Sequence, residues 1–156
     1  MEIGKKAPKF NSVNQNDVAV SSDDLKGNSY ILFFYPRDNT SGCTKEAIGF
    51  TDHLDDFAKH GVKIMGVSKD SAKSHIKFIE KHELGMDLLS DEHGTMCEDF
   101  SVWKEKSMYG KTYFGIERST FVVSKTGILL AEWRKVKVPG HVEEVLDWVK
   151  ANADAL

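Results

Sequence analysis

The sequence predicts a single α/β domain in which helices flank a central mixed β-sheet. Two observations support this fold class: apolar runs of strand length alternate with segments of helical periodicity, and no repeat or Pro/Gly/Ser-rich linker interrupts the 156 residues. A composition of 40% hydrophobic and 29% charged residues is ordinary for a soluble globular protein. We therefore expect residues 1–156 to form one domain.

The first strand and helix of the predicted domain lie on either side of a short polar stretch. Residues 30–35 (YILFFY) form a continuous apolar run, which is typical of a strand buried on both faces. From Cys43 onward, apolar residues recur at helical spacing, which predicts a helix that ends near Gly61. The apolar stripe of this helix consists of Phe50, Leu54, Phe57 and Ala58.

The alternation of strands and helices continues to the end of the chain. Residues 62–68 predict the next strand, and Asp70 or Ser71 can cap a following helix. The apolar positions of that helix are Ala72, Ile76 and Ile79. The later expected elements are a strand at 87–89, a weak helix at 95–100, a hairpin with strands at 119–124 and 128–136, and a helix around 142–149. This order is expected of a thioredoxin-like sandwich.

Composition and charge argue against several classes of function. The formal net charge of −3 gives no reason to expect binding to nucleic acid or to a membrane. The first residues lack the apolar core of a secretion signal, and two cysteines make no disulfide framework, so we expect a cytoplasmic protein. The six histidines show no metal-binding spacing, so we expect no metal or other cofactor, and histidines that face solvent or cap helices.

Cys43 follows the predicted strand at 30–35 and begins the predicted helix, among small polar residues in the stretch FFYPRDNTSGCTKEA. Reactive groups of α/β sheets gather beyond the carboxyl ends of the strands. There the unpaired N–H groups and the dipole of a helix favour a thiolate and lower the pKa of a cysteine. An inert cysteine more often has apolar surroundings. The sequence therefore indicates that Cys43 is a reactive nucleophile.

The neighbours of Cys43 suit such a site. Pro36 ends the strand and restricts the entry to the turn. The hydroxyl of Thr40 can both donate and accept hydrogen bonds, which suits a substrate with hydroxyl groups. Gly42 allows a close approach of other groups to the backbone. A permanent cation is still needed to hold the thiolate, and Arg118, at the start of a predicted strand, is the candidate.

The pattern Pro36-x-x-x-Thr40-x-x-Cys43 resembles the active-site signature of the peroxiredoxins, which are thiol peroxidases on a thioredoxin-like fold. The segments PRDNTSGCTKEA, DSAKSHIKF, LLSDEHG and YGKTYFGIERSTFVVSKTG, together with KKAPKF near the start, resemble the bacterioferritin comigratory protein or peroxiredoxin Q branch in order and spacing. The resemblance covers essentially the whole chain.

This resemblance implies that Cys43 is the peroxidatic cysteine, which attacks hydrogen peroxide or an organic hydroperoxide and becomes a sulfenic acid. Thr40 would hydrogen-bond the substrate oxygens, and Arg118 would stabilise the thiolate and the developing negative charge. Pro36 would shield the thiolate, and Glu46 would orient the arginine. The implied partners are a hydroperoxide and a reductant, which is thioredoxin, glutaredoxin or a small thiol; the branch is often monomeric.

Two features depart from the pattern of this branch. Ser41 stands where a proline is usual, which predicts a more flexible turn with the same chemistry. The positions at which relatives carry a resolving cysteine hold Ile48, five residues after Cys43, and an apolar residue near Ile79. The standard partners for an intramolecular disulfide are therefore absent.

Cys97 is the only other cysteine. It is either a helix-face residue packed beside Phe100, since free cysteines are among the most often buried residues, or a non-standard resolving cysteine. The second role requires local unfolding, because a disulfide needs Cα atoms within about 7 Å of each other. We favour the first, and with it a one-cysteine mechanism that uses an external thiol.

Two other functions compete with this interpretation. A thiol–disulfide oxidoreductase of the same fold needs two vicinal cysteines, and Cys43 has no such neighbour. A non-enzymatic binding or chaperone module does not need Pro36, Thr40, Cys43 and Arg118 together. The aromatic residues of the segment 103–114 are expected to pack mainly in the core or a loop, with some lining an entrance for organic hydroperoxides.

Overall fold

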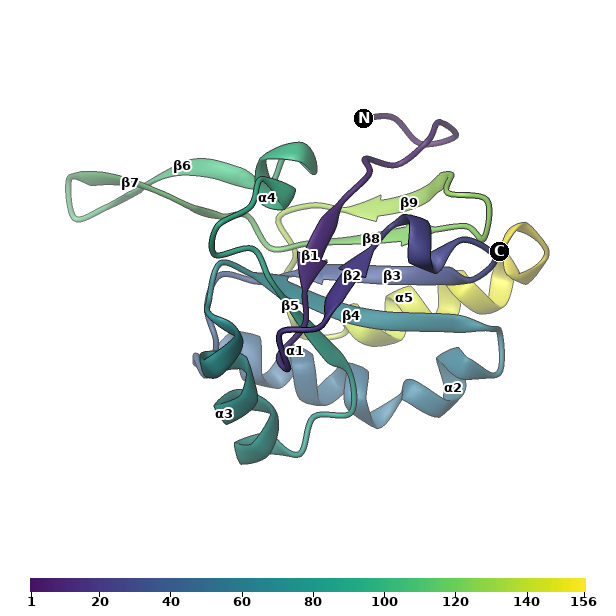
Figure 1. Ribbon diagram of the computed structural model, residues 1–156, viewed down its shortest axis with the longest axis horizontal. Coiled ribbons are helices and arrows are strands. Elements are labelled where there is room, and N and C mark those ends of the chain that lie inside the picture. Colours follow the sequence, from purple (N-terminus) through teal and green to yellow (C-terminus); the bar gives the residue numbers. More distant parts are fainter.

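A seven-stranded mixed sheet forms the centre of the computed structural model, which describes residues 1–156 (Figure 1). The strand order is β2-β1-β5-β4-β3-β8-β9. Strand β3 (Ser29–Phe34) pairs in parallel with β4 (Val62–Ser68) and antiparallel with β8 (Ser119–Val123). The outer strands are β1 (Asn11–Val13), β2 (Ala19–Ser21), β5 (Asp87–Ser90) and β9 (Leu129–Trp133). The predicted mixed sheet is confirmed.

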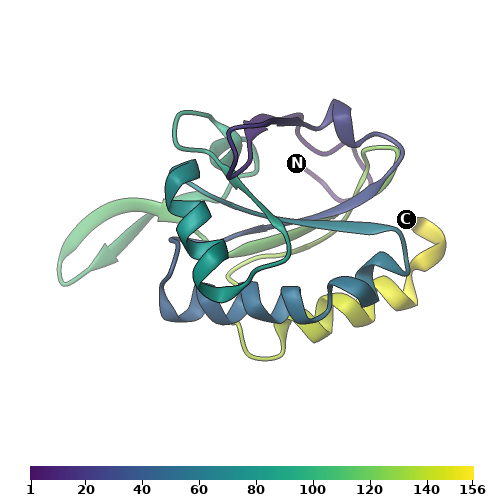
Figure 2. The ribbon, with the colours of Figure 1, turned by 60° about the horizontal axis from the view of Figure 1, so that its bottom comes forward.

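The two faces of the sheet carry different layers (Figure 2). The first face is covered by the longer helices, which are α1 (Ser41–Asp52), α2 (Leu54–Ala58), α3 (Ala72–His82) and α5 (His141–Ala151). The second face is covered by the amino-terminal segment, the short helix η1 (Asp23–Leu25) and α4 (Met96–Asp99). A last turn, η2 (Ala153–Ala155), ends the chain. None of the helices has the length and apolar character needed to cross a membrane.

Strand β3 separates two apolar clusters, which explains its continuous apolar sequence. Successive side chains of a strand point to opposite faces of a sheet. The first cluster, on the first face, receives Ile31, Phe33 and Tyr35, and the second receives Tyr30, Leu32 and Phe34. Every residue of β3 is buried, so the prediction of a strand buried on both faces is confirmed.

The helix predicted between Cys43 and Gly61 is interrupted. The backbone of His53 (φ −110°, ψ 9°) is not helical, so α1 ends before it and α2 begins after it. Phe50 and Phe57 are buried as predicted, but Ala58 is exposed because the interruption rotates the second segment.

The apolar positions predicted for α3 are not the ones that the helix buries most deeply, although Ile79 packs against the first cluster. The residues that α3 buries are His75 and Phe78, whereas Ala72, Ile76 and Ile79 are only half-buried. Phe78 fills the first cluster, and His75, one turn earlier, meets polar groups behind the loop that follows β3. The buried face of α3 therefore includes a polar residue that the apolar pattern did not indicate.

Two hairpins are absent from the prediction. Strands β1 and β2 pair at one edge of the sheet. Strands β6 (Trp103–Met108) and β7 (Lys111–Ile116) form a separate two-stranded arm that projects away from the domain (Figure 1). Trp103, at the base of the arm, packs against the second cluster, but the aromatic residues farther out do not enter the core as expected, since Tyr109 is 97% exposed and Phe114 is 58% exposed. Strand β9 also ends at Trp133, before the predicted boundary.

Gly66 in β4 offers a test of how tightly the sheet packs on the first face. A Cβ atom at Gly66 would lie 2.7 Å from Leu88 Cδ2 and 2.8 Å from Phe33 Cζ, both fully buried. We expect Gly66→Ala to lower the free energy of unfolding by about 1–3 kcal/mol, because the core cannot accept the methyl group without strain. Urea unfolding measures this, with exposed Ser107→Ala as control. Equal stability of the two variants would contradict the packing described.

Candidate active site

Cys43 is the third residue of α1, directly beyond the carboxyl end of β3. Thr40 occupies the cap position with extended backbone (φ −89°, ψ 157°), so the helix begins within one turn of the cysteine. The thiol faces the first cluster and is 2% exposed. The expectation that Cys43 lacks apolar surroundings is therefore wrong, because the helix turns its side chain inward although the neighbouring residues in the sequence are polar.

Arg118 contacts Cys43 directly. Its Nη2 donates to Cys43 Sγ at 3.3 Å, and its Nη1 donates to Glu46 Oε1 at 2.7 Å. The antiparallel pairing of β8 with β3 sets Ser119 opposite Phe34, which brings Arg118 to the end of β3 where the cysteine follows. The structure thus brings Arg118 into contact with both Cys43 and Glu46, although it lies more than 70 residues after them in the sequence.

Gly42 leaves room for this contact. A Cβ atom at that position would lie 3.3 Å from Arg118 Nη2. A glycine beside the cysteine therefore lets the guanidinium group approach the start of the helix closely.

The charge of the guanidinium group is maintained by its partners. Burial lowers the pKa of Arg118, but its interactions with the carboxyl of Glu46 and the sulfur of Cys43 raise it, and the net pKa lies above the ordinary value. Arg118 is therefore a permanent cation in contact with the sulfur.

Glu46 is fully buried one helical turn after Cys43. Its Oε1 accepts from Arg118, whereas its Oε2 has no hydrogen-bond partner. Burial raises the pKa of Glu46 to about 7, although Arg118 opposes the change. The unpartnered oxygen gives the physical reason, because a buried carboxylate with half of its acceptors unsatisfied is costly.

Thr40 and Pro36 lie on the exposed side of the loop between β3 and α1. The Thr40 hydroxyl donates to the carbonyl of Arg37 at 2.9 Å and makes no hydrogen bond with Cys43. Ser41, the residue in place of the usual proline, is the first residue of α1 and does not disturb its start. The Thr40 oxygen keeps its acceptor capacity, on an exposed residue at the start of the helix that carries Cys43.

A buried polar network supports this loop from behind, and sequence analysis missed it. Tyr35 Oη donates to Asp38 Oδ1 at 2.5 Å, and His75 Nδ1 lies 2.7 Å from Asp38 Oδ2. His75 Nε2 lies 3.0 Å from the carbonyl of Leu89, and the Asp38 backbone N–H donates to Asp70 Oδ2 at 2.8 Å. The network ties the loop to α3 and β5 and fixes the backbone that leads to Cys43.

The expectation that the histidines face solvent is wrong for two of them. His75 is fully buried in the network described above, and His141 is 4% exposed. His141 Nε2 lies 2.7 Å from the Thr120 hydroxyl, and burial lowers the pKa of His141 to about 4. The apolar periodicity of the sequence could not predict that these two histidines are buried, because their polar partners come from other parts of the chain.

Cys97 lies on the opposite side of the sheet from Cys43. It is fully buried in the second cluster with Phe100, which confirms the predicted packing. Burial raises the pKa of the Cys97 thiol well above its ordinary value, and Asp91 adds to the effect. Cys97 is thus a protonated and enclosed thiol, separated from Cys43 by the sheet.

The model of the AhpC/TSA family matches residues 3–131. The chain belongs to the AhpC/TSA family. The putative peroxiredoxin Bcp of Coxiella burnetii is 49% identical over 146 residues, which are 94% of this chain and 97% of that protein. Peroxiredoxin Bcp of Bacillus subtilis is 48% identical over 150 residues, 96% of each chain. The solved structure of PrxQ from Xylella fastidiosa aligns with a TM-score of 0.93 at 38% identity over 98% of both chains.

These similarities confirm the resemblance to the bacterioferritin comigratory protein and peroxiredoxin Q branch, and with it the thioredoxin-like fold. The chain is a peroxiredoxin, that is, a thiol-dependent peroxidase. The alternatives of a thiol–disulfide oxidoreductase and of a non-enzymatic binding module are therefore set aside.

The raised pKa of Glu46 predicts a pH dependence of stability in this peroxiredoxin. Between the ordinary value of 4.5 and the folded value of about 7, the folded state binds more protons than the unfolded state. Its free energy of unfolding therefore decreases as pH rises across this interval. The side chain of the Glu46→Gln variant cannot ionise. We therefore expect the free energy of unfolding of the variant, relative to that of the wild type, to rise by roughly 2–3 kcal/mol from pH 4.5 to pH 7.

Urea unfolding at several pH values measures the difference between Glu46→Gln and the wild type. The exposed Glu105→Gln is the matched control and should follow the wild type at every pH. A Glu46→Gln difference that is independent of pH would show that the carboxyl titrates normally.

Proposed function

We propose that Cys43 is the peroxidatic residue and that this peroxiredoxin follows a one-cysteine mechanism. The observation that carries the first part is the contact of 3.3 Å between Arg118 Nη2 and Cys43 Sγ. The thiolate sulfur bonds to the terminal oxygen of the hydroperoxide as the O–O bond breaks. The transferred oxygen keeps its proton and forms the sulfenic acid, while the leaving alkoxide or hydroxide takes a proton and departs as alcohol or water.

Arg118 and Glu46 act on this step through charge. The guanidinium group stabilises the thiolate and then the negative charge that develops on the leaving oxygen. Glu46 holds one edge of the guanidinium group at 2.7 Å, so the other edge stays directed at the sulfur. A planar guanidinium with several donors suits this double task better than an ammonium group.

Thr40 and Pro36 form the approach to the sulfur. The Thr40 hydroxyl donates to Arg37 in the free protein, and its oxygen is available to accept from the O–H of a bound hydroperoxide. Pro36 screens the thiolate from bulk water. All of these groups come from one chain, which supports activity as a monomer.

The second part of the proposal rests on the separation of the two cysteines by the sheet. Cys43 belongs to the first cluster and Cys97 to the second. Disulfide formation between them would require the core of the domain to open. An external thiol therefore attacks the sulfenic acid, water leaves, and a second thiol releases Cys43 from the mixed disulfide. Thioredoxin, glutaredoxin or a small thiol supplies the reductant.

The substrates we propose are hydrogen peroxide and organic hydroperoxides. A solved structure of the Xanthomonas campestris bacterioferritin comigratory protein, 42% identical over 92% of this chain, is described in terms of alkyl peroxide reduction. Exposed aromatic residues of the β6–β7 arm provide apolar surface for an alkyl group.

The oxidation product of Cys43 tests the one-cysteine mechanism. After one equivalent of hydrogen peroxide, with a sulfenic-acid trap present, we expect an adduct on Cys43 and a free Cys97 thiol by intact mass and peptide mapping. Cys43→Ser should give no adduct and no turnover, and Cys97→Ser should retain turnover with an external thiol. A Cys43–Cys97 cross-link, with loss of two hydrogen atoms and no adduct, would show that Cys97 resolves.

Arg118 should control the rate of the first step. We expect Arg118→Ala to slow sulfenic-acid formation by about 100-fold or more, since removal of one donor to a developing anion has effects of this size. Stopped-flow measurement of peroxide consumption at low peroxide concentration gives the rate constant. Arg37→Ala, an exposed arginine in the same loop whose side chain has no ion pair, is the control and should keep the wild-type rate. Equal rates for the two variants would remove Arg118 from the mechanism.

A further inference from the structure

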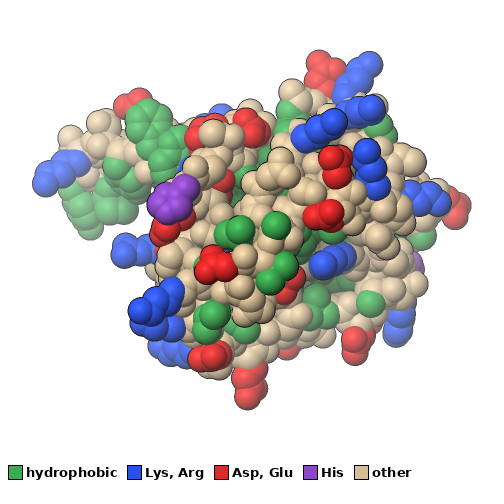
Figure 3. Space-filling view, in the orientation of Figure 1, with side chains coloured by type: hydrophobic (Ala, Val, Ile, Leu, Met, Phe, Trp, Pro, Cys, Tyr) green, Lys and Arg blue, Asp and Glu red, His purple; other side chains and the backbone are tan.

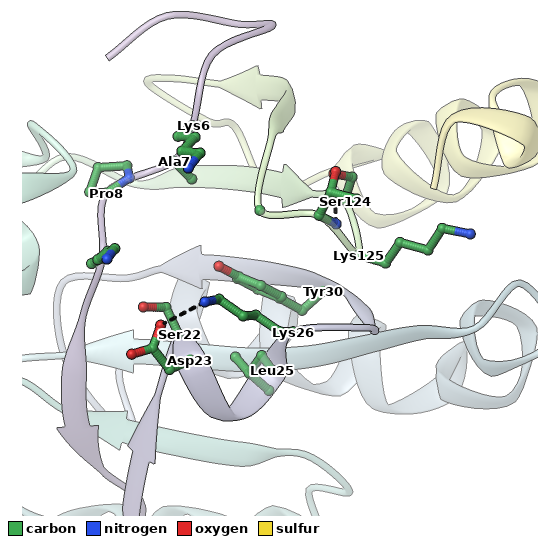
Figure 4. Close-up of a pocket in the computed structure, with 13 residues that line it drawn as sticks. Lys6, Ala7, Pro8, Ser22, Asp23, Leu25, Lys26, Tyr30, Ser124 and Lys125 are labelled. Atoms are coloured by element: carbon green, nitrogen blue, oxygen red, sulfur yellow. Dashed lines mark hydrogen bonds and ion pairs between the residues drawn. The ribbon is translucent and has the colours of Figure 1, made fainter.

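A small cavity opens on the second face of the domain, at the amino end of β3. Its walls come from the amino-terminal segment at residues 6–9, the region of η1, and the turn at residues 124–127 between β8 and β9 (Figure 4). Its volume is about 110 Å³. Cys43 lies beyond the other end of β3 and on the other face, so the cavity is separate from the active site.

The cavity is strongly basic. Four lysines line it, Lys6, Lys9, Lys26 and Lys125, against a single carboxylate from Asp23. Lys26 lies 3.5 Å from Asp23, whereas the other three lysines form no ion pair. This concentration of uncompensated positive charge is notable in a chain with a net charge of −3. Several Lys and Arg side chains lie on the upper right of the surface in Figure 3, with some Asp and Glu side chains among them.

Tyr30 provides an unpartnered donor in the wall of this cavity. The residue is only 3% exposed, and its hydroxyl makes no hydrogen bond with any protein atom. The hydroxyl oxygen is nevertheless not sealed from the cavity, and Figure 4 shows the hydroxyl end of the ring directed toward the Ser22 side. Burial raises the pKa of Tyr30 to about 12, so the phenol keeps its proton and can donate it in a hydrogen bond.

The other hydroxyls of the cavity already have structural partners. Ser22 Oγ accepts from the Phe10 backbone N–H at 3.1 Å. Ser124 Oγ accepts from the Ile128 backbone N–H at 3.1 Å and lies 2.9 Å from the Thr126 hydroxyl. The groups left for a ligand are therefore donors, namely the phenol of Tyr30 and the ammonium groups of Lys6 and Lys9. Such a set matches an anion with several oxygen atoms.

We propose that this cavity binds a phosphate group. Lys6 and Lys9 line the cavity without an ion pair, whereas Lys125 extends away from Tyr30 (Figure 4). Two such ammonium groups match a dianion better than a monoanionic carboxylate, and a phosphate monoester carries a charge near −2 at neutral pH. Lysine binds phosphate as a point charge, and the Tyr30 hydroxyl adds a directed, charge-assisted hydrogen bond. The volume admits a phosphate with few waters, since one water occupies about 30 Å³ in the liquid. The ligand is either inorganic phosphate or the phosphate of a larger molecule that extends to solvent.

Calorimetric titration with inorganic phosphate, at constant ionic strength set with chloride, tests the proposal on the full-length protein. We expect saturable binding of one phosphate per chain. Tyr30→Phe should raise Kd by roughly 10- to 100-fold, because a hydrogen bond to a charged group contributes a free energy of that size. The substitution removes no hydrogen bond within the protein, so the folded structure should persist by circular dichroism. The double variant Lys6→Gln, Lys9→Gln should also lose binding.

Matched controls separate a site from general attraction between charges. Tyr109→Phe and Lys77→Gln change exposed residues away from the cavity and should keep the wild-type Kd. Cys43→Ser should bind phosphate as the wild type does, so this test is independent of the proposed peroxidase mechanism. Absence of saturable binding at millimolar phosphate, or equal weakening in the controls, would overturn the proposal.

Titration with glycerol 3-phosphate and with adenosine monophosphate distinguishes the sources of the phosphate group. Tighter binding of either ester than of inorganic phosphate, lost in Tyr30→Phe, would support a larger ligand. Binding of inorganic phosphate alone would support the free ion.

Discussion

The burial of β3 on both faces is the constraint on which the rest of the molecule depends. Its alternate side chains enter two separate apolar clusters, and every other layer of the domain packs on one of them. The strand must therefore end where the chain can leave the core, and α1 starts there with Cys43 near its first turn. The antiparallel pairing with β8 then brings Arg118 to the same end. The arrangement of the site follows from the pairing of the central strands.

Electrostatics explains why the three groups of the site stay together. A buried ionisable group is costly unless another charge or hydrogen bonds compensate for the loss of water. Arg118 serves both Cys43 and Glu46 through different nitrogens of one rigid plane. Removal of any one group leaves the others buried without a full set of partners. The free Oε2 of Glu46 shows that this compensation is incomplete, and burial accordingly raises the pKa of that carboxyl although Arg118 opposes the change.

The network behind the loop gives the site its rigidity. Asp38 accepts from Tyr35 and Ser74 and contacts His75, so both of its oxygens are occupied. A fully satisfied buried network favours one conformation of the backbone that it holds. Here that backbone is the loop with Pro36 and Thr40, which keeps its place without a hydrogen bond from Thr40 to Cys43.

The sequence by itself determined the class of the fold, the order of most elements and the position of Cys43 between a strand and a helix. These features are local, because hydrophobic periodicity and turn residues act over a few positions. The resemblance to the peroxiredoxins also identified Thr40, Arg118 and Glu46 by their place in motifs. The sequence did not predict the β6–β7 arm, since its aromatic residues resemble core residues by composition although they lie in solvent.

Tertiary structure alone decided the environment of each cysteine and histidine. Cys43 and Cys97 have neighbours of similar polarity in the sequence, and only the sheet shows that they lie on opposite faces. His75 enters the core because Asp38 and Leu89 come from other elements to satisfy its two nitrogens. The cavity beside Tyr30 likewise depends on residues from elsewhere in the chain, since Lys6 and Lys9 come from the amino-terminal segment to line it. Contacts between residues far apart in the chain depend on strand pairing and side-chain packing, which local patterns do not contain.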